Sequence, residues 1–190
     1  MTELNRYRQL DCPAHIRDQI VRLMRDEWPH SSRNDEVEWP SESLELNPIS
    51  IVLTTDGVVI CHAAVLRKTI AHVGKQYLAF GLSAMVTAQP YRRRGFGRLV
   101  LERATRYMAE EGADFGIFTC DEQLGRFYNW NGWEISKTSP LIGGTKAKPF
   151  PSEQLGKITL LQLFSCRAKA DREAILSTPV YIELGEGKLW

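Results

Sequence analysis

The chain has 190 residues, 43% of them hydrophobic, a length and apolar content that suit one globular domain spanning residues 1–190. Its 24 basic and 23 acidic residues nearly cancel to a formal net charge of +1, which excludes a general affinity for nucleic acid and requires any basic site to be local. No apolar run approaches the ~20 residues that span a bilayer, and the four scattered cysteines lack CxxC or metal-ligand spacing, so we expect a cytoplasmic protein with no membrane partner and no metal.

The first predicted element is a helix that begins at Pro13. Apolar residues follow at helical spacing and define one face: Ile16, Ile20, Leu23, Met24 and Trp28. Residues 29–48 are polar, acidic and interrupted by prolines, so they form either a long loop or a loop that carries a short helix.

Three strands and a second helix are expected next. Residues 49–70 read as two strands around an Asp56-Gly57 turn, and residues 75–87 as a third strand, which together make an antiparallel meander. Helix two runs from about Gly95 to Glu111. Because the segment ADFGIFTC after it reads as a strand, the strand–helix–strand sequence predicts a parallel crossover.

The last third of the chain predicts a short helix and further strands. The helix is EQLGRFYNW, and the strands are WEISK, KITLLQLF and VYIELG. The expected fold class is therefore α/β (α+β), with a mixed central sheet, an antiparallel N-terminal meander, a parallel crossover through helix two, and flanking helices.

The stretch QPYRRRGFGR forms the first turn of helix two, at the carboxyl end of a strand. Backbone N–H groups and the helix dipole favour an anion there, glycines let it approach the backbone, and arginines add positive charge. A phosphate or pyrophosphate fits best, against the alternative of a solvated basic helix start. The stretch is neither a Walker A loop nor the dinucleotide GxGxxG motif, because Val100 stands where the third glycine would be.

Arg92-x-x-Gly95-x-Gly97, after a strand and Pro90, resembles the R/Q-x-x-G-x-G/A motif of the GCN5-related N-acetyltransferases (GNAT). FYNWNGW is similar to a second signature of that family, and the resemblance covers most of the chain. It implies that acetyl-CoA is the cofactor and that the third strand pairs with its pantetheine arm while the helix start holds its pyrophosphate. The cofactor-binding residues implied are Met85, Val86, Thr87, Arg92, Arg93, Arg94, Gly95, Phe96, Gly97 and Arg98.

The same resemblance implies catalytic roles. Tyr128 matches the tyrosine that donates a proton to the departing thiolate, a transfer that the similar pKa values of a phenol and a thiol allow. Many members carry a glutamate base on the third strand, but this chain has Ser83 in that region. Ser83 holding a water in a relay, or His62 acting as base, are the alternatives, and each of these residues can equally be a plain member of the sheet.

The chain ends look like those of the aminoglycoside 2'-N-acetyltransferase subfamily, in which a terminal tryptophan and its carboxylate line the acceptor site. Trp190 carries over by that resemblance. Acidic lining for that acceptor would come from Asp35, Glu36, Glu38 and Glu42 of the loop, with Glu183, Glu186 and the chain-end carboxylate opposite. The alternative is that the loop is simply an acidic, solvated segment. Ser83 and Lys188 depart from the subfamily, which has acidic residues at both places.

Three functions follow from these residues. The leading one is an acetyl-CoA-dependent N-acetyltransferase that acts on a primary amine of a small molecule. In the more specific version of this prediction, that small molecule is aminoglycoside-like. The alternative is a non-catalytic acyl-CoA-binding or sensor module, because the family's glutamate is missing. Nucleic-acid binding is disfavoured by the acidic side chains of helix two and the lack of an aromatic platform. The resemblance also allows a homodimer, since family members commonly dimerise.

Overall fold

The computed structural model of the chain describes residues 1–29, 39–136 and 139–190. Two compact units are formed, one by Met1–Leu66 with Leu82–Thr105 and the other by Arg67–Gly81 with Arg106–Trp190. Three elements each contribute residues to both units: strand β3 (Val58–His72), strand β4 (Lys75–Thr87) and helix α2 (Phe96–Glu110).

The first unit is built on strands in the order β1 (Thr2–Arg8), β2 (Ile49–Thr55), β3 and β4. β2 pairs antiparallel with both β1 and β3, and the predicted turn between β2 and β3 has left-handed backbone at Asp56 (φ 50°) and Gly57 (φ 78°), as a tight hairpin requires. The predicted meander is confirmed. β1 was not expected, because its polar sequence gives no apolar alternation.

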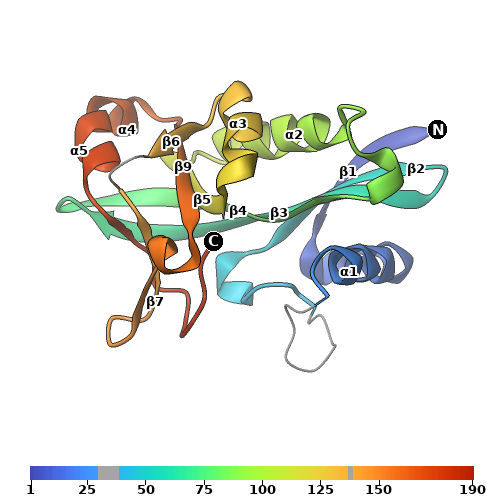
Figure 1. Ribbon diagram of the computed structural model, residues 1–190, viewed down its shortest axis with the longest axis horizontal. Coiled ribbons are helices and arrows are strands. Elements are labelled where there is room, and N and C mark those ends of the chain that lie inside the picture. Colours follow the sequence, from blue (N-terminus) through green and yellow to red (C-terminus); the bar gives the residue numbers. More distant parts are fainter. Residues whose placement is uncertain (30–38, 137–138) are drawn as a thin grey trace. The chain divides into compact units, whose positions relative to one another are not determined.

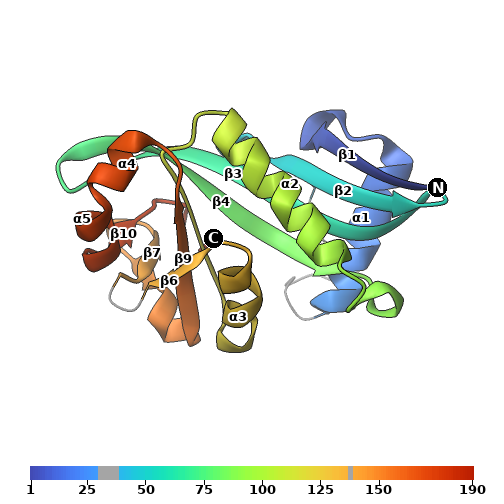
Figure 2. The ribbon, with the colours of Figure 1, turned by 90° about the horizontal axis from the view of Figure 1, so that it is seen from above.

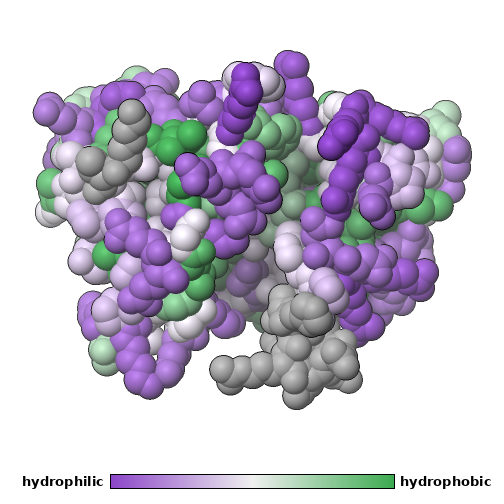
Figure 3. All heavy atoms as spheres, in the orientation of Figure 1, coloured by the Kyte–Doolittle hydropathy of each residue, from purple (hydrophilic) through white to green (hydrophobic). Residues whose placement is uncertain are grey.

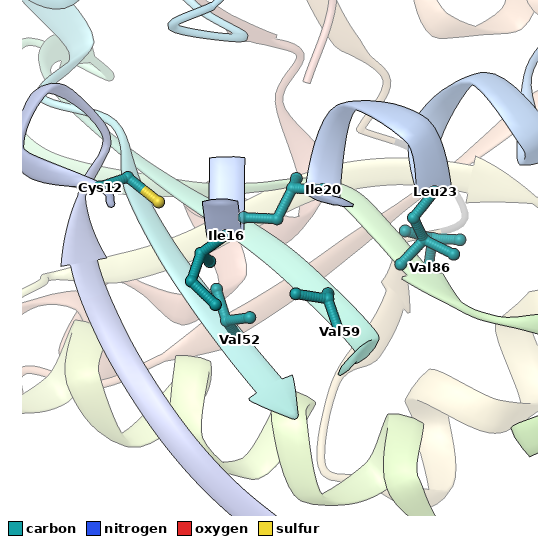
Figure 4. Packing of buried hydrophobic residues seen from close by; sticks show 7 residues of the cluster. All are labelled: Cys12, Ile16, Ile20, Leu23, Val52, Val59 and Val86. Atoms are coloured by element: carbon teal, nitrogen blue, oxygen red, sulfur yellow. The ribbon is translucent and has the colours of Figure 1, made fainter. Parts of the chain in front are cut away.

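Helix α1 (Ala14–Glu27) covers one face of these strands, and the first part of α2 lies over the opposite face (Figures 1 and 2). Figure 4 shows Ile16, Ile20 and Leu23 of α1 packed with Val52, Val59 and Val86 of the strands. The predicted apolar face is confirmed except at its end. Because α1 stops at Glu27, Trp28 leaves the face and is 38% exposed.

The second unit has strands in the order β4, β5 (Phe115–Asp121), β9 (Lys157–Leu163) and β6 (Glu134–Ser136). β4 and β5 pair in parallel at Ala79 with Phe115 and at Phe80 with Gly116, so the predicted crossover through helix two is confirmed. β9 runs antiparallel to β5 and β6, and helix α3 (Glu122–Trp130) packs on these strands.

A second sheet of three short strands belongs to the same unit, in the order β10 (Val180–Tyr181), β7 (Leu141–Gly144) and β8 (Pro149–Pro151). The predicted strand VYIELG is thus reduced to two residues. β7, β8 and the helices α4 (Cys166–Ala170) and α5 (Arg172–Ser177) had no sequence prediction.

Short 3-10 turns complete the described chain: Gln9–Asp11, Leu44–Leu46, Gln89–Tyr91 and Ser152–Leu155. The turn at Leu44–Leu46 is the short helix that the sequence allowed within the long loop, whereas Asp35, Glu36 and Glu38 of that loop lie outside the described residues. In the part of the chain that the structure describes, no helix is long and apolar enough to cross a membrane.

Candidate active site

The segment between β4 and α2 has the backbone of an anion-binding turn. Arg93 (φ 61°) and Gly95 (φ 85°) are both left-handed, and the side of Gly95 where a Cβ would project has no atom within 4 Å. α2 begins at Phe96, so its first turn presents N–H groups that have no intrahelical acceptor. The predicted helix start is therefore confirmed within one residue.

The arginines of this turn have different surroundings. Arg92 anchors the turn, because its Nε donates to the carbonyl of Thr87 at 2.9 Å and its guanidinium pairs with Glu27. The Arg94 guanidinium lies 5.7 Å from the centre of the Tyr91 ring. Arg93 and Arg94 are exposed, so their charges remain open to an anion at this turn.

The end of β4 carries the three residues that the family resemblance places against pantetheine. Val86 turns its side chain into the core against α1, and Thr87 places its hydroxyl 3.1 Å from the Cys61 thiol. Met85 and Thr87 are half-buried. These side chains fix the strand, which leaves pairing with a ligand amide to the main chain.

Ala84 interrupts the regular extended backbone of β4, with a φ of 46°. A non-glycine residue in this region costs about 1–2 kcal/mol, so the surroundings must impose the conformation. His62, on β3, is fully buried and places Nδ1 3.1 Å from the Ala84 carbonyl oxygen. The imidazole therefore holds the irregular carbonyl in place.

The protonation of His62 follows from its partners. A carbonyl only accepts, so Nδ1 carries the proton, and burial lowers the pKa of His62 to about 4, which keeps the ring neutral. Nε2 then accepts from the Ser50 hydroxyl at 3.0 Å, and Ser50 accepts from the Gln9 amide at 3.2 Å. Both ring nitrogens are engaged and the ring has no exposure, which favours a role for His62 in positioning the strand.

Ser83 precedes this irregular residue and donates a hydrogen bond to the Glu42 carboxylate at 3.1 Å. Glu42 comes from the long loop, 41 residues earlier in the chain. The pair supplies a carboxylate at the strand position where the sequence has only a serine. Sequence reasoning placed Glu42 among general acidic lining residues, and no local signal joined it to Ser83.

Tyr128 of α3 belongs to the second unit and is buried, 5% exposed. Its ring meets Phe118 edge-on at 4.8 Å between centroids, and Phe127 at 5.0 Å. Trp133 packs on Phe118 at the same 4.8 Å separation and is fully buried, whereas Trp130 is 74% exposed. The Tyr128 ring is thus held rigidly, as both a positioned acid and a core tyrosine would be.

Trp190, also in the second unit, is seated and 4% exposed. A Cβ on Gly81 of β4 would lie 2.4 Å from the indole, so the glycine makes room for the ring. The main-chain N–H of Thr119 on β5 donates to the Trp190 main-chain oxygen at 2.9 Å, and the Thr119 hydroxyl donates at 2.5 Å. Among the described residues the indole Nε1 has no hydrogen-bond acceptor although it is buried.

The acidic residues expected opposite the loop are already paired. Glu183 lies 3.6 Å from Lys146, and Glu186 lies 2.7 Å from Lys148. Asp35 and Glu36, the other predicted acceptor residues, fall outside the described residues. Across the described ranges, His, Cys, Asp and Glu side chains form no group of three that would hold a metal ion.

Comparison with known proteins places this geometry in a family. A family model described as an acetyltransferase (GNAT) domain matches residues 13–136, and the chain belongs to that family. It is an acyltransferase, and acetyl-CoA is its cofactor. No curated protein matches the chain significantly.

Solved structures share the fold at low identity. An aminoglycoside 6'-N-acetyltransferase complexed with coenzyme A is 12% identical over 86% of this chain and 97% of that one, with a TM-score of 0.63. ElaA of Escherichia coli is 10% identical over 85% and 99%, with a TM-score of 0.62. Glucosamine-6-phosphate N-acetyltransferase of Arabidopsis thaliana is 16% identical over 70% and 90%, with a TM-score of 0.55.

The residues after β4 fit coenzyme A. The left-handed Gly95, with open space beside it, and the exposed Arg93 and Arg94 suit a pyrophosphate at the start of α2. When bound, acetyl-CoA would supply an acetyl thioester; the start of α2 would hold its pyrophosphate and the end of β4 its pantetheine arm.

Gly97→Glu should abolish stabilisation by coenzyme A. Gly97 lies within helical backbone, so a glutamate can adopt the same backbone conformation. Its negative charge would repel an anion at the helix start. Wild-type protein should gain roughly 2.7 kcal/mol at ~100 Kd of ligand, measured by thermal shift, and the variant should gain nothing. A full shift in the variant would contradict pyrophosphate binding at this turn.

His62→Asn should remove one source of acid lability. Because the folded-state pKa of His62 is lowered to about 4 from 6.5, its neutral burial contributes stability that is complete above pH 6.5 and is lost as the pH falls to 4. Asparagine keeps an amide donor near Ala84 but does not titrate. Denaturant unfolding between pH 6.5 and 4 should show the wild type losing on the order of 1 kcal/mol per pH unit more than the variant. Parallel profiles for the two proteins would mean that His62 does not titrate there.

Proposed function

We propose that this protein transfers the acetyl group of acetyl-CoA to a primary amine of a small molecule. The observation that carries the proposal is the hydrogen bond between Ser83 and Glu42. It places a carboxylate beside the strand whose next residues, Met85 to Thr87, are proposed to align the acyl group. In this proposal Glu42 serves as the proton acceptor in place of the glutamate that the sequence of β4 lacks.

The chemistry requires proton transfers at both ends of the reaction. The neutral amine attacks the thioester carbonyl, a C–N bond forms and the C–S bond breaks. Glu42, directly or through the Ser83 hydroxyl, takes the proton that the amine loses, as a general base. Tyr128 gives a proton to the departing sulfur, and the products are an amide and the thiol of coenzyme A.

The acceptor can be narrowed by charge. The more specific version of the proposal has an aminoglycoside-like amine as the acceptor. It is supported by Trp190, whose buried indole Nε1 has no hydrogen-bond acceptor among the described residues. Against it, Glu183 and Glu186 are each neutralised by a lysine, which leaves less acidic surface for a polycation. We therefore favour an acceptor with fewer ammonium groups than an aminoglycoside.

The alternative, a non-catalytic acyl-CoA-binding or sensor module, depended on the missing glutamate. The carboxylate of Glu42 beside Ser83 removes that reason. A sensor would bind acetyl-CoA and release no thiol with any amine.

Thiol release from acetyl-CoA, followed across polyamines, amino acids, peptide amines and aminoglycosides, tests the function. We expect turnover with at least one amine and a low rate of hydrolysis without one. Trp190→Ala should raise the KM for that amine without changing acetyl-CoA affinity, whereas Trp130→Ala, at an exposed tryptophan, should change neither. Binding of acetyl-CoA without turnover of any amine would favour the sensor.

Glu42→Gln should lower kcat by about 10²-fold with little change in the KM for acetyl-CoA, because the amide occupies the same space but cannot take a proton. Steady-state kinetics with an amine that the panel shows to be a substrate give both constants. Ser83→Ala should cost less than Glu42→Gln if the carboxylate acts directly.

The matched control is Glu45→Gln, an exposed glutamate of the Leu44–Leu46 turn, which should retain wild-type rates. Equal kinetics for Glu42→Gln and Glu45→Gln would exclude Glu42 as the base.

A further inference from the structure

A cavity of about 480 Å³ lies wholly within the second unit, between β3 and the small sheet of β7, β8 and β10. Its volume is within the range of small-molecule sites. Neither the turn that we assign to coenzyme A nor the Ser83–Glu42 pair contributes to its lining. Of the residues considered above for the acceptor, Glu183 alone lines this cavity, which therefore lies apart from the cofactor turn and the proposed base.

The inner wall of the cavity is apolar. Ile70 of β3 faces Ile142 of β7 and Ile182, which follows β10, and all three are at least nine-tenths buried. The Tyr181 side chain, 59% exposed, adds an aromatic wall toward the solvent. Such a lining takes up a hydrocarbon or aryl body that is removed from water.

The charged side chains of the lining are Lys68, Lys146 and Glu183, and both lysines contact Glu183. Lys68 donates to the main-chain oxygen of Glu183, and Lys146 lies 3.6 Å from the Glu183 carboxylate. Only Lys146 pairs with the Glu183 carboxylate, since Lys68 contacts a main-chain oxygen, and Thr69, Gln76 and Thr145 add no charge. The lining carries a net positive charge, which favours an anion and disfavours an amine.

The surface around this lining is polar. The β7–β8 hairpin, at the lower left in Figure 1, is hydrophilic in the same place in Figure 3. An apolar wall beside a polar rim with two lysines suits an amphipathic ligand, with the body inside and the charge at the rim.

We propose that this cavity binds a small molecule with an apolar body and a carboxylate. The body lies against Ile70, Ile142 and Ile182, and the carboxylate is held between the ammonium groups of Lys68 and Lys146. This site is separate from acetyl transfer, and the proposal does not depend on the proposed function.

The test uses three probes of one length: octanoate, octylammonium and octanol. Protein with 13C-labelled isoleucine methyl groups is titrated with each, without acetyl-CoA, and the resonances of Ile70, Ile142 and Ile182 are followed after assignment by isoleucine-to-valine variants. Octanoate should shift these resonances and bind at least 10-fold more tightly than octylammonium, with octanol between them. Coenzyme A at saturation should leave octanoate affinity unchanged.

Two lysines of the same hairpin supply a matched pair of variants. Lys146→Glu reverses a charge of the lining and should weaken octanoate at least 10-fold. Lys148→Glu makes the same change at a lysine that pairs with Glu186 outside the cavity, and should leave octanoate affinity unchanged. Lys68→Met, which keeps the stem and removes the charge, should weaken octanoate without weakening octanol.

Any of four results would overturn the proposal. They are the absence of shifts at the three isoleucines, equal affinity for octanoate and octylammonium, equal effects of Lys146→Glu and Lys148→Glu, and displacement of octanoate by coenzyme A. Each is obtained by binding alone, so failure of this site leaves the acetyltransferase proposal to its own kinetic test.

Discussion

The hydrogen bond from the buried His62 imidazole to the Ala84 carbonyl is the constraint on which the β4 part of the candidate site depends. Ala84 has left-handed backbone in the middle of an otherwise extended strand. Without a fixed donor, its carbonyl would lose a buried partner, a cost of about 1–3 kcal/mol. The bond therefore fixes the direction in which β4 leaves Ala84 toward Met85 and Thr87.

That constraint extends away from the strand through further polar groups. Ser50 and Gln9 are buried, and the Gln9 side chain also bonds Ser41, through the Ser41 N–H at 2.8 Å. Ser41 is the residue before Glu42. The chain of hydrogen bonds that runs from His62 through Ser50 and Gln9 thus also anchors the loop residue next to the proposed base. One network positions both the irregular strand and the carboxylate beside it.

Elements with a strong local signal were predictable. The apolar face of α1, the Asp56-Gly57 hairpin and the start of α2 all follow from periodicity, turn chemistry or capping glycines, and the structure has them within one or two residues. β1 and β7 escaped prediction because their pairing with β2 and with β8 and β10, rather than their own composition, makes them strands. Backbone pairing between distant segments cannot be recognised from a local sequence pattern.

The candidate site likewise has one part that the local sequence predicts and another part that it does not. The anion-binding turn is encoded within a few consecutive residues, so its glycines and arginines were found together. The Ser83–Glu42 pair joins residues 41 positions apart, and the hydrogen bonds of His62 join Ala84, Ser50 and Gln9, which are also distant in the sequence. The sequence therefore shows which cofactor the chain is built to hold more readily than it shows how a proton leaves the acceptor.

The position of residues 188–190 depends on glycines elsewhere in the chain that leave room for them. A Cβ on Gly143 would lie 2.1 Å from the Lys188 carbonyl oxygen, and one on Gly81 would lie within the indole. The Gly144 N–H donates to the same Lys188 oxygen at 2.9 Å. Glycines of two different sheets thus admit one segment, while Thr119 binds its last residue. Hydrogen bonds at Lys188 and Trp190, together with the space that Gly81 and Gly143 leave, fix the position of the indole.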